Sequence, residues 1–123
     1  MKVPGRKPGA SSSLVETTDI FPSLCALAGI DTPATVQGSD FTALLDDPKK
    51  PFHEAAYSRF LSADAVVTDY FSYTSYEGGK AEMLYDLSED PQENRNVAGD
   101  PKYAGTLATM KKLLKNRQVE AAK

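Results

Sequence analysis

A run of acidic and amide side chains between Met83 and Val97 holds the densest set of chemically active groups in the sequence. The stretch reads MLYDLSEDPQENRNV. Its candidate groups are Asp86, Ser88, Glu89, Asp90, Gln92, Glu93, Asn94 and Asn96. An EF-hand calcium loop needs Gly at its sixth position and a bidentate Glu at its twelfth. Counted from Asp86, those positions hold Pro91 and Val97, so the spacing does not predict an EF-hand.

Two other chemistries remain for this stretch, a pair of catalytic carboxylates and a hydrogen-bonded turn. Carboxylates that divide acid and base roles flank a substrate, and such a pair usually comes from separate elements. The four carboxylates here all lie on one short segment. Asp90-Pro91 is typical of a turn, because Asp accepts hydrogen bonds from nearby backbone amides and Pro fixes φ. We therefore expect a structural turn.

The chain has one cysteine, Cys25, and one histidine, His53. A single cysteine excludes a disulfide framework within the chain and a cysteine-based metal site. Cys25 could act as a nucleophile only with a nearby base, for which His53 is the one histidine available. We expect instead that Cys25 is a small buried hydrophobic residue and that His53 lies at the surface or at the entry to a strand.

Composition and charge describe an ordinary globular protein. The 14 basic and 17 acidic residues give a net charge of −3, which does not favour nucleic acid as a partner. The basic cluster Lys111, Lys112, Lys115 and Arg117 is expected at the solvated C-terminal end of a helix. No segment has the apolar length of a membrane span. The first 13 residues lack the apolar core of a secretory signal, and the compartment stays open.

The elements that would position these groups fall into two parts. Residues 1–13 are expected to be loop, and a short helix is predicted over 19–28, with Asp19 as its cap and Gly29 as its end. Its apolar residues at helical spacing should pack on another element. Residues 31–51 are mostly loop, with one helical turn within 39–45.

After Phe52 the pattern changes to alternating strands. Val, Tyr, Phe and Thr are frequent, and a turn is predicted at Glu77–Lys80. We expect about four antiparallel strands, with Phe71, Tyr73 and Ser75 on one face of the sheet. A last helix should start at Asp100 and Pro101 and pack on the sheet. Its apolar stripe would be Tyr103, Leu107, Met110 and Leu114.

Two stretches in this order resemble the end of a formylglycine-dependent sulfatase, in the iduronate-2-sulfatase-like branch of the alkaline-phosphatase-like superfamily. The first is LVETTDIFPSLCALAGIDTP, followed by QGSDFTALLDDP. The second is MLYDLSEDPQENRNVAGDPKY. The resemblance covers roughly residues 3 to 118. Ser23 stands where the family usually has Thr after Pro.

The resemblance implies an α+β fold, a small four-stranded antiparallel sheet with a C-terminal helix packed on it. The last helix and loop of a larger α/β sulfatase domain would precede that sheet. Residues 1–48 would be the tail end of the large α/β domain, and residues 49–123 would be the C-terminal sulfatase subdomain. The family's formylglycine motif, its calcium ligands and its remaining active-site residues have no match in the chain. We therefore expect no catalytic and no metal residue in this chain.

The function implied is that of a C-terminal segment of a sulfuric ester hydrolase acting on sulfated carbohydrate or related sulfate esters, inactive alone. Calcium and formylglycine would belong to the complete enzyme. Val67, Tyr70 and Ser72 occupy hairpin positions that are often basic in relatives, which leaves Arg59 as a candidate for the rim of a substrate site. The alternative for Arg59 is a plain surface residue of a strand.

Two rival functions stay open from the sequence. One is a free-standing protein-interaction module, and the other is a fragment of a phosphate or phosphonate ester hydrolase of the same superfamily. The expected partners are the missing N-terminal sulfatase domain or a second copy of the chain, because the exposed apolar faces invite association. Nucleic acid and membrane are not expected as partners. Complete members of the family are often secreted, periplasmic or lysosomal.

Overall fold

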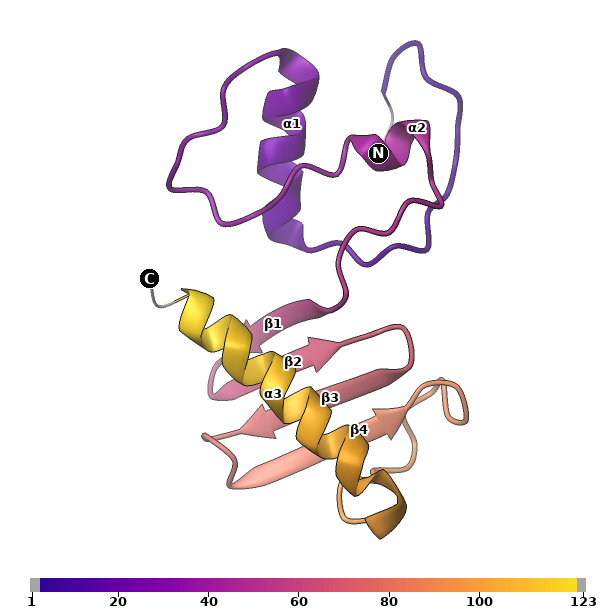
Figure 1. The fold of residues 1–123 in the computed structure, drawn as a ribbon, viewed down its shortest axis with the longest axis vertical. Helices are drawn as coiled ribbons and strands as arrows, with labels where there is room; N and C mark the ends of the chain where they lie inside the picture. Colours follow the sequence, from indigo (N-terminus) through magenta and orange to yellow (C-terminus); the bar gives the residue numbers. More distant parts are fainter. Residues whose placement is uncertain (1–2, 122–123) are drawn as a thin grey trace. The chain divides into compact units, whose positions relative to one another are not determined.

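The structure is a computed structural model that describes residues 3–121 of the chain. The residues group into two compact units, Met1–Glu54 and Ala55–Lys123, each of which is described by itself (Figure 1). No helix among the described residues is long and apolar enough to cross a membrane. The assignment of residues 1–48 to a larger α/β domain stays a prediction.

From residue 3 onward, the first unit holds three short helical elements connected by loops. These are the 3-10 helix η1 (Thr17–Asp19) and the α-helices α1 (Ile20–Ala28) and α2 (Ala43–Asp46). Gly29 ends α1 with a φ of 67°, a left-handed conformation that glycine adopts at little cost. Leu14 and His53 form an isolated antiparallel bridge.

Asp19 does not cap α1 in the way the sequence predicts. It occupies the N-cap position, but its carboxylate makes no capping hydrogen bond to that helix. Instead one carboxylate oxygen accepts the backbone N–H of Glu16, three residues earlier. The prediction that the Asp19 side chain caps α1 is therefore wrong, although the helix begins where expected.

The second unit is a four-stranded antiparallel sheet covered on one face by a long helix. The strands β1 (Ala56–Phe60), β2 (Ala63–Val67), β3 (Phe71–Tyr76) and β4 (Ala81–Asp86) lie side by side in chain order. The 3-10 helix η2 (Pro101–Tyr103) leads into α3 (Ala104–Ala121), which crosses the sheet (Figure 1). The predicted α+β fold, with its sheet and C-terminal helix, is confirmed.

The core of the second unit lies between α3 and the sheet. Val66, Tyr73 and Leu84 are paired neighbours on three adjacent strands, and each is at most 2% exposed. Met110 and Leu114 of α3 pack against them, with Tyr103 and Leu107 partly buried alongside. These four helix residues are the predicted apolar stripe. Burial of this stripe holds α3 on the sheet, since apolar area removed from water stabilises by about 25 cal/mol per Å².

Candidate functional site

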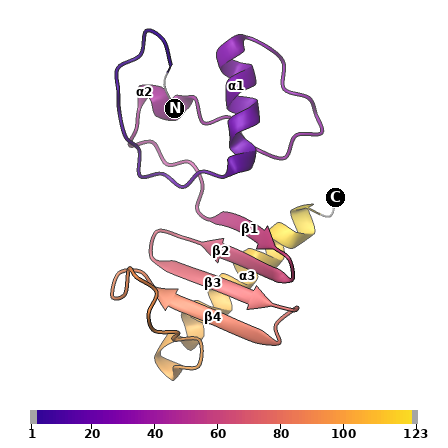
Figure 2. The ribbon, with the colours of Figure 1, turned by 180° about the vertical axis from the view of Figure 1, so that it is seen from behind.

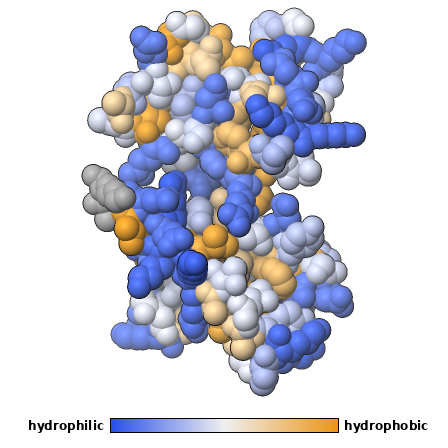
Figure 3. All heavy atoms as spheres, viewed as in Figure 1, coloured by the Kyte–Doolittle hydropathy of each residue, from blue (hydrophilic) through white to orange (hydrophobic). Residues whose placement is uncertain are grey.

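Helix α1 presents large apolar side chains to solvent. Its nine residues, IFPSLCALA, include no charged residue. Ile20, Phe21 and Leu24 are 44%, 53% and 49% exposed. In the space-filling view, hydrophobic side chains reach the surface of the unit that carries α1 (Figure 3). A helix that is apolar on all sides is typical of the interior of a larger protein, so this face is a candidate interaction surface.

The opposite side of α1 is fixed within its own unit. Pro22, Ser23 and Cys25 are buried. The Ser23 hydroxyl donates to the Asp19 carbonyl at 2.7 Å and accepts the Phe41 N–H at 2.9 Å, which ties α1 to the loop before α2. Cys25 is the expected buried thiol. The face with Ile20 and Phe21 is therefore held outward by polar contacts behind it.

Asp19 is the centre of those polar contacts and is 1% exposed. One carboxylate oxygen accepts the Ser39 N–H at 2.8 Å. The other accepts the Glu16 N–H at 2.7 Å and lies 2.9 Å from His53 Nε2. A buried carboxylate is tolerated when hydrogen-bond donors surround it in this way. We call Asp19, Ser23, Ser39 and His53 the polar anchor.

Gly38 lets the loop of the polar anchor approach η1 closely. A Cβ atom on Gly38 would lie 2.0 Å from the carbonyl oxygen of Thr18, so only glycine fits there. This contact places the Ser39 N–H beside the Asp19 carboxylate. The sequence placed Gly38 in a loop without indicating this role.

The Asp19–His53 pair has the residue types of a catalytic dyad, but its surroundings support an anchoring role. A hydrolytic triad needs a nucleophile within hydrogen-bond reach of the histidine. Ser23, the buried hydroxyl of the anchor, is engaged with two backbone groups instead. His53 is partly buried, and its ring lies 4.2 Å from the Phe52 ring, centroid to centroid, at a tilt of 50°. The sequence predicted that His53 lies at the surface or at a strand entry but did not indicate its partner Asp19, which lies 34 residues away.

Arg59 lies on β1, with its side chain 71% exposed. Its guanidinium donates to both oxygens of the Asp64 carboxylate, at 2.6 and 3.0 Å. The hydrogen bonds from Arg59 hold the pKa of Asp64 below its usual value, against the opposing effect of burial, and a hydrogen bond from Gln118 lowers it further. The arginine therefore already has an anionic partner within its own hairpin. Its role at a substrate rim stays a prediction.

The acidic stretch forms the expected turn. Asp86 accepts from the Ser88 and Glu89 N–H groups and from the Ser88 and Tyr103 hydroxyls. Asp90 accepts from the Arg95 N–H and the Asn94 amide. These hydrogen bonds lower the pKa of both carboxyls. The largest contribution comes from the Ser88 hydroxyl for Asp86 and from the Arg95 N–H for Asp90.

Asp86 and Asp90 do not fit a calcium ion, because their carboxylate oxygens already accept protein hydrogen bonds. No group of three or more His, Cys, Asp or Glu suited to a metal occurs within the described part of the chain. Asp86 and Asp90 are therefore assigned to the turn, and Asp86 also contacts the entry of the last helix through Tyr103.

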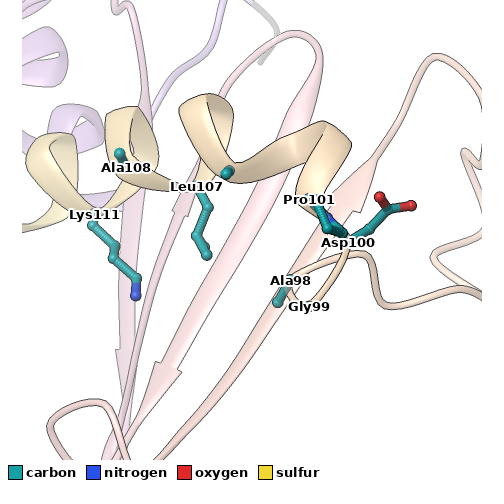
Figure 4. A pocket seen from close by; sticks show the side chains of 8 residues that line it. Ala98, Gly99, Asp100, Pro101, Leu107, Ala108 and Lys111 are labelled. Carbon is teal, nitrogen blue, oxygen red and sulfur yellow. The ribbon is translucent and has the colours of Figure 1, made fainter.

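A shallow hollow of about 270 Å³ lies beside the start of α3 (Figure 4). Its lining is mostly small and apolar, with Asp100 and Lys111 as the charged groups. Lys111 Nζ lies 2.7 Å from the Glu82 carboxylate, and Asp100 accepts the Lys102 N–H as the cap of η2. Both charges are thus satisfied by structural contacts. The hollow offers little to orient a polar ligand.

Glu82 connects α3 to the sheet. It accepts a 2.6 Å hydrogen bond from the Tyr73 hydroxyl and pairs with Lys111. The Lys111 and Tyr73 hydrogen bonds lower the pKa of Glu82. Burial, followed by the bond to Glu82, raises the pKa of Tyr73 to about 12. Charge-assisted bonds of this kind fix the orientation of the helix on the sheet.

Comparison with known proteins identifies the family. Residues 1–120 match the family described as N-sulphoglucosamine sulphohydrolase, C-terminal. The delta 4,5-hexuronate-2-O-sulfatase of Bacteroides thetaiotaomicron is 38% identical over 107 residues, which cover 80% of this chain and 22% of the relative. Human arylsulfatase K is 31% identical over 114 residues, which cover 80% of this chain and 21% of the relative. The chain thus spans about a fifth of the length of these relatives.

Solved structures show the same fold. A 2-O GAG sulfatase superimposes with a TM-score of 0.72 at 33% identity, over 85% of this chain and 25% of that one. The phosphonate monoester hydrolase of Silicibacter pomeroyi reaches a TM-score of 0.85 at 20% identity, over 97% of this chain and 28% of that one. The predicted resemblance to the C-terminal part of a sulfatase is confirmed. The chain belongs to the N-sulphoglucosamine sulphohydrolase C-terminal family, and it corresponds to the C-terminal part of a sulfatase with the alkaline-phosphatase-like fold.

Proposed function

We propose that this chain works as the C-terminal part of a sulfuric ester hydrolase that acts on sulfated carbohydrate, with the catalytic centre in an N-terminal region of the complete enzyme. The observation that carries the proposal is the family match over residues 1–120. The sequence relatives named above are sulfatases, one of them named for a hexuronate 2-O-sulfate. Each is several times longer than this chain.

The geometry supports a structural role in such an enzyme. Formylglycine and calcium belong, in this proposal, to the N-terminal region. Cys25 is buried and is followed by Ala26 and Leu27 instead of the Cys/Ser-x-Pro-x-Arg motif, and the carboxylates of Asp86 and Asp90 in the turn accept protein hydrogen bonds. Helix α1, uncharged and apolar on its exposed side, suits packing against that region. This chain would support the catalytic domain and border its substrate cleft, and Arg59 is a candidate residue for that border.

A sulfate ester is favoured over a phosphonate ester as the substrate of the complete enzyme. The likeness to a phosphonate monoester hydrolase, at 20% identity, concerns the fold. The curated relatives at 31% and 38% identity are sulfatases. For the same reason a hydrolase part is favoured over a free-standing interaction module.

A chimaera tests the proposal. The C-terminal part of the Bacteroides hexuronate-2-O-sulfatase that aligns with this chain is replaced by all 123 residues. We expect the chimaera to hydrolyse the parent's substrate and the parent truncated before that part to be inactive. A folded, soluble chimaera that is as inactive as the truncated parent would contradict the proposal. The isolated chain should show no turnover of an aryl sulfate with calcium, and turnover abolished by a chelator would contradict a role without a catalytic centre.

A further inference from the structure

The positive charge of the chain is concentrated on its last helical segment. Residues 101–118 include no acidic residue and five basic ones, namely Lys102, Lys111, Lys112, Lys115 and Arg117. The other nine of the 14 basic residues and all 17 acidic residues lie elsewhere, which gives the rest of the chain a net charge of −8. Neither the fold nor the proposed function accounts for this separation of charge.

The helix dipole does not account for the basic residues of α3. Positive side chains stabilise a helix when they lie within its last turn. The sequence placed the cluster at such an end, but the last turn of α3 contains no basic residue, and Lys111 and Lys112 lie in its middle. That expectation is therefore wrong. Lys115 also follows Lys111 by four residues and Lys112 by three, and like charges at these spacings destabilise a helix.

Lys112 and Lys115 face away from the sheet. Helix α3 lies on one side of the sheet, in front of it in Figure 1 and behind it in Figure 2. Met110 of α3 is buried against the sheet. With about 3.6 residues per turn, Lys112 and Lys115 lie roughly 160° and 140° around the helix axis from Met110. Both lysines are exposed, as this geometry requires.

The chain uses some of its helical basic residues in structural contacts. Lys111 Nζ lies 2.7 Å from the Glu82 carboxylate, and the Arg117 guanidinium lies over an aromatic ring of β1. Within residues 3–121, the structure describes no ion pair for Lys112 or Lys115. We call Lys112 and Lys115, with Lys111 at their edge, the basic stripe. Two of its three ammonium groups thus have a structural contact neither with the sheet nor with a carboxylate.

The density of these charges is typical of a surface that binds a polyanion. Residues 111–117 contain four Lys or Arg in seven positions, and short segments of this kind form patches for nucleic acid or heparin. The net charge of −8 on the rest of the chain opposes a long, stiff polyanion that would extend past the helix. A short sulfated saccharide can lie along one or two turns of α3. The distribution of charge therefore favours the saccharide.

We propose that the basic stripe binds the sulfate groups of a sulfated oligosaccharide. This inference rests on the proposed function, from which it takes the class of ligand. Ammonium groups are compact point charges on flexible stems, which suits sulfates at varied positions on a sugar. Asn116 is exposed one turn after Lys112 and offers amide donors beside the stripe.

A binding measurement on the 123-residue chain tests the proposal without using activity. The probe is a fluorescently labelled heparin hexasaccharide, followed by anisotropy. We expect binding that weakens as salt is added, because the contacts are exposed ion pairs. The same hexasaccharide without its sulfates should bind about tenfold more weakly or less. Absence of binding at low salt, or equal binding of the two saccharides, would overturn the proposal.

A matched pair of double variants locates the binding. Lys112→Gln with Lys115→Gln removes two charges from the stripe, and Lys49→Gln with Lys50→Gln removes two from exposed residues of the first unit. We expect the first pair to weaken binding about fivefold or more and the second to change it less than about twofold. Equal losses would show that net charge alone governs binding and would overturn the proposal. Thermal unfolding of both double variants shows whether each still folds.

An NMR titration of the wild-type chain maps the site without any variant. The amides of residues 111–116 should shift as the hexasaccharide is added. Shifts confined to the basic residues of the first unit would overturn the proposal. A single-stranded DNA oligomer with the same number of negative charges tests the other class of ligand. Equal or tighter binding of the DNA would assign the stripe to nucleic acid and overturn the proposal.

The outcomes separate this inference from the proposed function. An inactive chimaera, with a chain that binds the hexasaccharide through the stripe, would refute the proposed function and keep the binding surface. An active chimaera, with a chain that binds no sulfated saccharide, would keep the proposed function and refute the binding surface.

Discussion

Replacing Asp19 with asparagine tests whether the polar anchor holds α1 in place. The substitution keeps the size of the side chain but replaces one acceptor oxygen with an NH₂ group. If the amide oxygen of the substituted side chain faces Glu16 and His53, its NH₂ group faces the Ser39 N–H. The Ser39 N–H then loses its acceptor and meets another donor. A buried donor left without a partner costs about 1–3 kcal/mol, and hydrogen bonds to a neutral oxygen are weaker than those to a carboxylate. We expect a total loss of about 2–4 kcal/mol.

That loss is large compared with the unit it affects. A unit of 54 residues has a free energy of unfolding of roughly 3–8 kcal/mol if it follows the usual range per residue. Asp19→Asn should therefore remove about half of the free energy of unfolding of the first unit. The second unit should keep its stability, because Asp19 belongs to the first unit.

Amide hydrogen exchange followed by NMR is the suitable assay, since the chain has no tryptophan to report unfolding by fluorescence. The Ser39 and Phe41 amides should exchange much faster in the variant than in the wild type. Asp40→Asn is the matched control, because Asp40 is exposed and accepts only local bonds from Thr42. We expect it to change stability by no more than about 0.5 kcal/mol. An unchanged Ser39 exchange rate in Asp19→Asn would refute the role given to the anchor.

Three further predictions concern the second unit. Met110→Ala, in the core under α3, should cost about 2–5 kcal/mol in urea unfolding followed by circular dichroism, and a loss no larger than that of the exposed Lys112→Ala would contradict the packing. Leu61→Asn should stabilise the isolated chain by about 1 kcal/mol, because asparagine tolerates positive φ better than leucine; a lower melting temperature would contradict strain at the hairpin tip. Glu82→Gln should destabilise at neutral pH but match the wild type in acid. The folded-state pKa of Glu82 is lowered, so its contribution is complete above the unfolded value of about 4.3 and is lost as pH falls through the lower folded value. Melting temperatures of both proteins between pH 7 and strongly acidic pH would test this, and a difference that did not shrink in acid would refute it.

Much of the second unit could be predicted because its signals are local. The stripe of Tyr103, Leu107, Met110 and Leu114 repeats with the period of a helix, and all four residues contact or lie in the core. The turn at Glu77–Lys80 and the alternation in β3 placed two strands and their faces. Patterns of this kind depend only on neighbours in sequence, and they predict well.

The first unit was harder to predict because its contacts connect distant residues. His53 and Asp19 lie 34 residues apart, and no spacing rule relates a histidine in a Pro-rich loop to an aspartate before a helix. Asp19 also has the position and type of a helix cap, so a local rule assigned its carboxylate to α1. In the structure, donors from Glu16, Ser39 and His53 surround the carboxylate, and the tertiary fold overrides the local rule.

The sequence alone determined the family, the order of the elements and the absence of the sulfatase catalytic motif from these 123 residues, because motifs and periodicity are properties of neighbours along the chain. Only the tertiary structure decided which charged side chains already have an ion-pair or hydrogen-bond partner within the chain. It paired Arg59 with Asp64 through the hairpin register, and it satisfied the acidic turn with backbone amides. It also brought uncharged residues of four strands together on the sheet face away from α3, since each strand contributes only three of its residues and the register alone aligns them.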